Sequence, residues 1–206
     1  MKSSSEHWNS IFSGAKDSKL GWYEEEASKT FELLNLIPEW EESTIFIPGS
    51  GTSILIEKLY NKGVNLILND ISIEALNKVK GRMQNSCNNI NWLCQDISLP
   101  IQDTTLNVDI WIDRAVLHFL TDEEAINGYF KNIESKLNVG GHAIFAEFSK
   151  TGSPKCAGLT LHLYSIKELS KRLGASFKLI SHFDYTFINP NGDPKPYIYG
   201  LYKRVA

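Results

Sequence analysis

The segment Thr44–Asp70, TIFIPGSGTSILIEKLYNKGVNLILND, decides the fold of this chain. A short apolar run, Ile45–Ile47, enters a Gly-Ser-Gly turn, and the apolar residues after the turn recur at helical spacing. Gly63 favours a helix end in the left-handed conformation, and a second apolar run, 64–68, follows and stops just before Asp70. The pattern predicts a β-α-β unit that ends in an acidic side chain.

The turn itself indicates a site for a cofactor that carries a nucleoside. Glycines let the backbone approach a ligand, and a carboxylate about 20 residues later can accept hydrogen bonds from two ribose hydroxyls. A dinucleotide fingerprint would need a glycine at Ile54. A phosphate loop would need Lys and Ser/Thr after Gly51, where this chain has Thr52 and Ser53.

Length and charge limit the possible classes of protein. The 206 residues, 42% hydrophobic and 22% charged, are typical of one globular domain. A net charge of −3 gives no electrostatic footprint for nucleic acid or a membrane surface, so we expect neither as a partner. We expect the protein to be a monomer or a dimer. No apolar run approaches the roughly 18 residues of a membrane span, and Met1–Ser5 is too polar for a signal peptide, so we expect a cytoplasmic protein.

The cysteines predict neither a disulfide framework nor a metal site. Cys87, Cys94 and Cys156 are odd in number and unevenly spaced, and no CxxC or HxxxH pair occurs. Nothing near Cys156 favours a reactive thiolate, so a structural or incidental role is the favoured interpretation.

Four aromatic side chains, Trp8, Phe12, Trp22 and Tyr23, gather in the segment 6–23. One interpretation is that they anchor the N-terminus on the domain. The other is that they form a lid over the cofactor and the acceptor, excluding water and holding the substrate.

A helix from Glu24 to Ile37, stopped by Pro38, is expected next. We therefore divide the single domain into an N-terminal aromatic cap with its first helix, 1–38, and an α/β core, 39–206.

A second acidic residue follows a third strand. Ser72 is a plausible N-cap for a helix from Ile73 to about Met83, and a strand over Ile90–Leu93 leads to Asp96. Because ligands of open α/β sheets bind at the carboxyl ends of the strands, we expect Asp96 close to Asp70. An exposed loop acid is the alternative.

The fourth strand, Val108–Ile112, ends in a group of polar side chains. Asp113 and Arg114 follow it directly and His118 lies four residues further on. Buried charges are costly unless paired, so the first two could be structural, and His118 could be a core histidine. Otherwise His118 is suited to orient an acceptor or take its proton near neutral pH.

The remaining elements complete a mostly parallel sheet. Thr121-x-x-Glu124 and Ser165-x-x-Glu168 resemble capping boxes for two helices. The expected strands are 142–148, then 178–187 and 197–203, the last two forming an antiparallel hairpin. A loop over 149–163 precedes the second capping box.

This order of elements, with a short GxG turn and an acid after the second strand, resembles the class I S-adenosylmethionine (SAM) dependent methyltransferases. The resemblance implies an α/β, Rossmann-like class I methyltransferase fold: a mostly parallel seven-stranded sheet with a C-terminal antiparallel hairpin and helices on both faces. It also implies SAM as cofactor, with S-adenosylhomocysteine (SAH) as product. The cofactor residues so implied are Pro48, Gly49, Ser50, Gly51, Thr52, Asp70, Ile71, Asp96, Ile97, Asp113 and Arg114.

The same resemblance assigns roles at the acceptor end. Asp113 and His118 are the catalytic candidates. Trp8, Trp22, Tyr23 and His118 are the candidates for contacting the substrate.

Two features distinguish this chain within that family. Ile47 stands where most members have an acid, and Ser53 where they have a third glycine. Pro48 before the turn, Asp113-Arg114 and the N-terminal aromatic residues are similar to the thiopurine methyltransferases. The opening segment is also similar to the elongation-factor lysine methyltransferases.

These features favour methyl transfer to a thiol, amine or other nucleophile of a small molecule. A protein lysine methyltransferase is the alternative. A non-catalytic SAM-binding module is a second alternative, motivated by Ile47, and the turn spacing disfavours a nicotinamide-dependent oxidoreductase.

Overall fold

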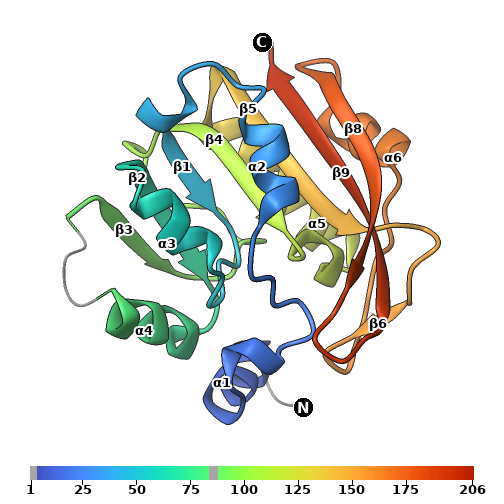
Figure 1. Cartoon of the computed structure of the whole chain (residues 1–206). Coiled ribbons are helices and arrows are strands. Elements are labelled where there is room, and N and C mark those ends of the chain that lie inside the picture. The colour runs from blue at the N-terminus through green and yellow to red at the C-terminus, as the bar shows by residue number, and fades with distance from the viewer. Residues whose placement is uncertain (1–3, 84–87) are drawn as a thin grey trace.

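A mixed sheet of seven strands forms the centre of the molecule, in the order β3-β2-β1-β4-β5-β9-β8 (Figure 1). The computed structural model describes residues 4–83 and 88–206. Strands β1 to β5 are parallel, whereas β9 is antiparallel to both β5 and β8. The strands are β1 (Thr44–Ile47), β2 (Asn65–Asp70), β3 (Ile90–Cys94), β4 (Val108–Arg114), β5 (Leu137–Phe148), β8 (Phe177–Ile188) and β9 (Pro194–Arg204). The predicted Rossmann-like sheet with its C-terminal hairpin is confirmed.

Helices cover both faces of this sheet because strand residues alternate between them. Ile45 and Ile47 pack with α2 to α4 on one face, and Phe46 and Trp111 pack with α5 and α6 on the other (Figure 1). The α-helices are α1 (Ser4–Gly14), α2 (Ser28–Leu34), α3 (Leu55–Tyr60), α4 (Ile73–Arg82), α5 (Glu123–Lys136) and α6 (Ile166–Leu173), and the 3₁₀ turns are Asp17–Lys19, Trp40–Glu42 and Leu117–Phe119.

Helix α1 lies apart from these layers, at the end of the sheet to which the parallel strands point (Figure 1). Its contacts with the body of the protein are mainly with α4. The N-terminal aromatic segment therefore stands over the carboxyl ends of the strands, where α/β sheets bind their ligands.

Two helices are shorter than expected. The helix predicted over 24–37 spans only Ser28–Leu34, because Ala27 is left-handed and separates Glu24 from the helical turns. The helix after the glycine turn, expected to run about three turns, spans only Leu55–Tyr60. The residues before this helix instead form the turn that surrounds the site.

The helix caps are mostly as predicted. Ser72 Oγ accepts from Ala75 N and Ser165 Oγ accepts from Glu168 N. The capping box at Thr121 is wrong, because the Asp122 carboxylate caps α5 instead. The expected loop over 149–163 contains a small antiparallel hairpin, β6 (Lys155–Cys156) with β7 (Leu159–Thr160).

The structure leaves the cysteines without an evident chemical role. Cys94 and Cys156 are free thiols, and Cys87 lies outside the described residues. Burial raises the pKa of the Cys156 thiol, which therefore stays protonated near neutral pH.

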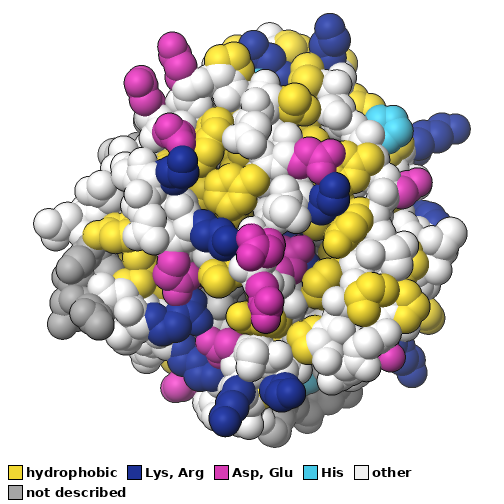
Figure 2. Space-filling model, viewed as in Figure 1, with side chains coloured by type: hydrophobic (Ala, Val, Ile, Leu, Met, Phe, Trp, Pro, Cys, Tyr) yellow, Lys and Arg dark blue, Asp and Glu magenta, His cyan; other side chains and the backbone are white. Residues whose placement is uncertain are grey.

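Charged side chains of both signs are interspersed over the face covered by α2 and α3 (Figure 2). Within residues 4–83 and 88–206, no helix is long and apolar enough to cross a membrane. The cytoplasmic location stays a prediction.

Candidate active site at the carboxyl edge of the sheet

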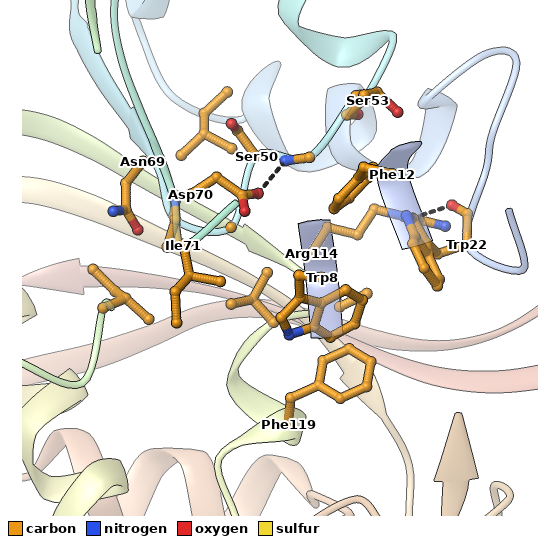
Figure 3. A pocket seen from close by; sticks show the side chains of 18 of the residues that line it. Trp8, Phe12, Trp22, Ser50, Ser53, Asn69, Asp70, Ile71, Arg114 and Phe119 are labelled. Atoms are coloured by element: carbon orange, nitrogen blue, oxygen red, sulfur yellow. Dashed lines mark hydrogen bonds between the residues drawn. The ribbon is translucent and has the colours of Figure 1, made fainter. Parts of the chain in front are cut away.

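A cavity of about 440 Å³ opens at the carboxyl ends of the parallel strands, beneath α1 (Figure 3). Its floor comes from the ends of β1, β2 and β4 and from the turns that follow them. Its roof comes from α1 and from the segment 20–24, which precedes α2. Residues from distant parts of the chain therefore close around one space of a size typical of small-molecule sites.

The Gly-Ser-Gly turn brings the backbone close to this space. Gly49 and Gly51 have φ values of +46° and +54°, which favour glycine. A Cβ on Gly49 would lie 2.5 Å from the Val116 side chain, and one on Gly51 would lie 3.3 Å from the Phe12 ring. The turn is held to the second strand by a hydrogen bond from Ser50 N to Asn69 O of 2.8 Å.

Asp70, at the end of β2, is fixed by the same turn. One carboxylate oxygen accepts from Gly51 N at 2.7 Å and the other accepts from Ser72 N at 2.8 Å. Burial raises the pKa of Asp70 to about 6, and the backbone donors only partly oppose that shift. Each carboxylate oxygen has two acceptor positions, so Asp70 can still accept from a ligand hydroxyl.

Asp96 and Ile97 line the cavity beyond the end of β3, as predicted from the strand order. The Asp96 carboxylate accepts from Ser98 N and Ser98 Oγ at 2.8 and 2.7 Å, which orders the loop. Ile71 lines the cavity between the two acids. The cavity lining after β2 and β3 therefore combines two acidic and two apolar side chains.

Aromatic rings form the opposite wall. The Trp8 ring lies edge-on to Phe119 and Trp22, at centroid distances of 4.8 and 5.7 Å, and Phe12 lies 6.2 Å from Trp22 (Figure 3). Tyr23 also lines the cavity. These contacts favour the lid interpretation over simple anchoring, since the rings line the cavity itself.

Arg114 joins the aromatic wall to the sheet. Its Nη1 donates to Trp22 O at 2.8 Å (Figure 3). Its Nε forms an ion pair of 2.8 Å with Glu24 Oε2. The two side chains are 11% and 13% exposed and both line the cavity. Buried charges of this kind are tolerated because they are paired.

The structure corrects the predictions for Asp113 and His118, neither of which lines the cavity. Asp113 is fully buried and accepts from Val116 N, Leu117 N and the Tyr129 hydroxyl. The side chain lies on the α5 face of the sheet, whereas Arg114 lies on the opposite face, because consecutive strand residues alternate.

His118 is likewise fully buried. Its Nδ1 shares a hydrogen bond of 2.6 Å with Glu147, and its ring stacks on Phe148. Burial lowers the pKa of His118 to about 3 and raises that of Glu147 to about 8, so the pair is uncharged near neutral pH. As placed here, Asp113 and His118 support the turn below the cavity and have no access to an acceptor.

Several lining residues were missed by sequence reasoning, although a signal existed for some of them. Phe12 belongs to the aromatic segment that the sequence shows, but no sequence motif marks it as a site residue. Glu24 was placed inside a helix, because nothing in the local sequence shows that Ala27 breaks it. The missed lining residues include His7, Phe12, Glu24, Val116, Phe119, Leu120 and Leu159.

The lining residues fit a nucleoside cofactor of the kind that the sequence implies. Ser50 Oγ and His7 Nε2 are buried, line the cavity and have no hydrogen-bond partner among the described residues. Such groups are normally satisfied, so they indicate a polar ligand. The predicted residues Pro48, Gly49, Ser50, Gly51, Thr52, Asp70, Ile71, Asp96, Ile97 and Arg114 all line the cavity, as do Trp8, Trp22 and Tyr23.

Comparison with protein-family models matches residues 47–145 to the family described as methyltransferase domain. The matched region begins at the end of β1 and ends within β5, so it contains the glycine turn, Asp70 and Asp96. No curated protein sequence matches the chain.

Solved structures share the fold over most of the chain at low sequence identity. A SAM-dependent methyltransferase from Anabaena variabilis has a TM-score of 0.76 at 14% identity, covering 97% of this chain and 93% of its own. The N-methyltransferase NodS from Bradyrhizobium japonicum, in complex with SAH, has a TM-score of 0.71 at 15% identity, covering 96% and 98%. The 1,6-didemethyltoxoflavin-N1-methyltransferase of Burkholderia thailandensis, with substrate and SAH bound, has a TM-score of 0.69 at 14% identity, covering 98% and 84%.

Proposed function

We propose that this chain is a SAM-dependent methyltransferase that transfers the methyl group to a nucleophile of a small molecule. The match of residues 47–145 to the methyltransferase-domain family and the fold shared with solved methyltransferases support this proposal. The thiol, amine or other nucleophile stands in the space between the cofactor residues and the aromatic wall. The observation that carries the proposal is the roofed cavity, in which the Trp8 ring makes T-shaped contacts with Trp22 and with Phe119.

An enclosed aromatic wall suits a flat or apolar small molecule. Rings packed edge to face present an apolar surface that gains from burying another ring or an alkyl group. A lysine side chain on a folded protein would have to enter past α1 and the segment 20–24. The Burkholderia neighbour contains 1,6-didemethyltoxoflavin, a small molecule, which supports the same choice.

SAM supplies an activated methyl group on a good leaving group. The residues of this chain therefore act mainly by alignment and exclusion of water. Asp70 accepts from the ribose hydroxyls, Ile71 and Ile97 pack on the adenine, and Asp96 accepts from its amino group. Aligning two bound reactants can lower the barrier by roughly 7–11 kcal/mol, more than the about 3–5 kcal/mol of a general base.

Labelled SAM distinguishes the small-molecule and protein acceptors. The purified protein is incubated with methyl-labelled SAM and a cell lysate, which is then separated into low-molecular-weight and protein fractions. We expect label in the low-molecular-weight fraction and none with Asp70→Ala, whose ribose contact is lost. Label confined to the protein fraction would overturn the proposal and favour a lysine methyltransferase.

The non-catalytic alternative gives a third result. SAM binding without label in either fraction, with several lysates and with simple thiols and amines, would overturn catalysis and favour a binding module. The similarity to thiopurine and elongation-factor methyltransferases stays a prediction that the label also tests.

A further inference from the structure

No acid precedes the glycine turn, because Ile47 stands at that position. The carboxylate of Glu24, from the N-terminal segment, lines the cavity beside the turn. Ile45 pairs with Ile110 in the parallel sheet, and continuing this register puts Ile47 beside Ile112. Arg114 lies two residues further along β4 and so on the same face. Glu24 joins it there, although it is 23 positions before Ile47 in the sequence (47 − 24).

The Arg114 guanidinium has capacity left for a ligand. Nη1 bonds to Trp22 O, Nε pairs with Glu24, and the plane packs near the rings of Phe187 and Tyr197 at 5.2 and 5.4 Å. Nε and Nη2 are both buried without a hydrogen bond among the described residues, Nε despite its ion pair with Glu24. Since buried guanidinium groups are normally satisfied, these two nitrogens, and Nη2 above all because it has no ion pair either, indicate a missing acceptor.

The position of this pair relative to the nucleoside residues decides which part of a ligand it meets. Asp70 and Asp96 follow β2 and β3, on one side of β1 in the sheet, whereas Arg114 ends β4 on the other side. A nucleoside held by the two acids therefore directs its 5′ substituent across the glycine turn toward β4. In SAM that substituent ends in an amino acid, with one ammonium and one carboxylate.

We propose that Glu24 and Arg114 form the subsite for the amino-acid end of SAM. The Glu24 carboxylate accepts from the α-ammonium group, and Arg114 Nη2 donates to the α-carboxylate. The side-by-side opposite charges complement a zwitterion, and Glu24 supplies from the N-terminal segment the acid that the turn lacks at Ile47. This inference rests on the function proposed above and deepens it.

Binding of two ligands tests the subsite without an acceptor. SAH has the amino-acid end, whereas 5′-methylthioadenosine has the same adenosine and sulfur without it. By titration calorimetry we expect Glu24→Gln to lower the affinity for SAH about tenfold or more, because a charge-assisted hydrogen bond is lost. The affinity for 5′-methylthioadenosine should stay within about twofold of the wild-type value. Glu25→Gln, at the exposed adjacent acid, is the matched control and should change neither.

Unchanged SAH affinity in Glu24→Gln, or an equal loss for both ligands, would overturn the subsite. Failure of the wild-type protein to bind either ligand would instead overturn the proposed function, so the two failures are distinguishable.

A second variant examines the carboxylate contact. Arg114→Lys keeps the positive charge but removes the Nη2 donor. It should therefore lower the affinity for SAH more than the affinity for decarboxylated SAH. Equal losses for these two ligands would overturn the Arg114 contact, and thermal melting checks that the variant is folded.

Discussion

At the scale of single residues, Asp70 combines a buried carboxylate with a task that needs its charge. The side chain is 4% exposed, and burial raises its pKa to about 6. An ionised carboxylate accepts stronger hydrogen bonds from ribose hydroxyls than a protonated one. With the ribose contact that we propose, the protonation state of Asp70 should therefore control nucleoside binding at mildly acidic pH.

The expected result is that 5′-methylthioadenosine binds about tenfold more weakly at pH 5 than at pH 7.5, since one unit below its pKa about a tenth of Asp70 is ionised. This ligand lacks the amino-acid end, so titration of Glu24 does not contribute. Calorimetry across this range measures the effect. In Asp70→Asn binding should be weak and independent of pH, and a flat wild-type profile would contradict the prediction.

At the scale of elements, α1 and the turn that follows it are held to α4 by apolar and polar contacts. Phe12 of α1 and Ala75 of α4 belong to one small buried cluster. The Asp17 carboxylate, in the 3₁₀ turn after α1, pairs with Lys78 Nζ at 3.1 Å and with Arg82 Nη1 at 2.7 Å, and Asn9 Oδ1 accepts from Ser72 Oγ at 2.7 Å. This small cluster and these ion pairs contribute less than the main core, so the lid that we propose can open without unfolding the domain.

Asp17→Asn removes the negative charge from both ion pairs and should loosen the lid. We expect amide hydrogen exchange in α1 to become about fivefold faster, which corresponds to roughly 1 kcal/mol for partly exposed pairs, with little change in the melting temperature. Hydrogen-exchange mass spectrometry measures it. Glu41→Gln, which breaks an exposed surface pair with Lys62, is the control, and equal exchange in both variants would count against the lid.

The elements also show why sequence reasoning succeeded for the core and not for the lid. The βαβ unit is specified locally, by apolar runs, a glycine turn and a cap at Ser72, and each signal lies within a few residues. Glu24, by contrast, pairs with Arg114, 90 residues away (114 − 24), and no local pattern reveals this contact. The same long-range information was needed to find Phe119 and Val116 in the cavity.

At the scale of the whole molecule, a further limit of sequence reasoning concerns burial. Asp113 and His118 stand at the position where the resemblance implies catalysis, and strand alternation could have separated Asp113 from Arg114. The side of the sheet that faces the cavity, however, follows only from how α1 and the segment 20–24 fold back. The structure instead assigns the two residues to a buried network with Glu147 and Tyr129.

That buried network makes the stability of the molecule depend on pH in a direction that can be worked out. Burial raises the pKa of Glu147 from 4.5 to about 8, so its contribution is present below pH 4.5 and is lost as the pH rises to 8. His118, with its pKa lowered from 6.5 to about 3, contributes above pH 6.5 and loses that contribution as the pH falls. Between pH 4.5 and 6.5 the two effects oppose each other, and above pH 6.5 the effect of His118 has ended. Burial and the neighbouring Glu147 also raise the pKa of Asp113, which acts in the same direction as Glu147.

The free energy of unfolding should therefore fall by about 2 kcal/mol between pH 6.5 and 8, at roughly 1.4 kcal/mol per pH unit for one proton. Glu147→Gln cannot ionise and can still accept from His118 N, so its stability should vary much less over the same interval. Urea unfolding at several pH values measures both proteins. A wild-type stability that is constant or rises from pH 6.5 to 8 would show that Glu147 is already ionised in the folded state, and that the buried pair below the cavity is charged.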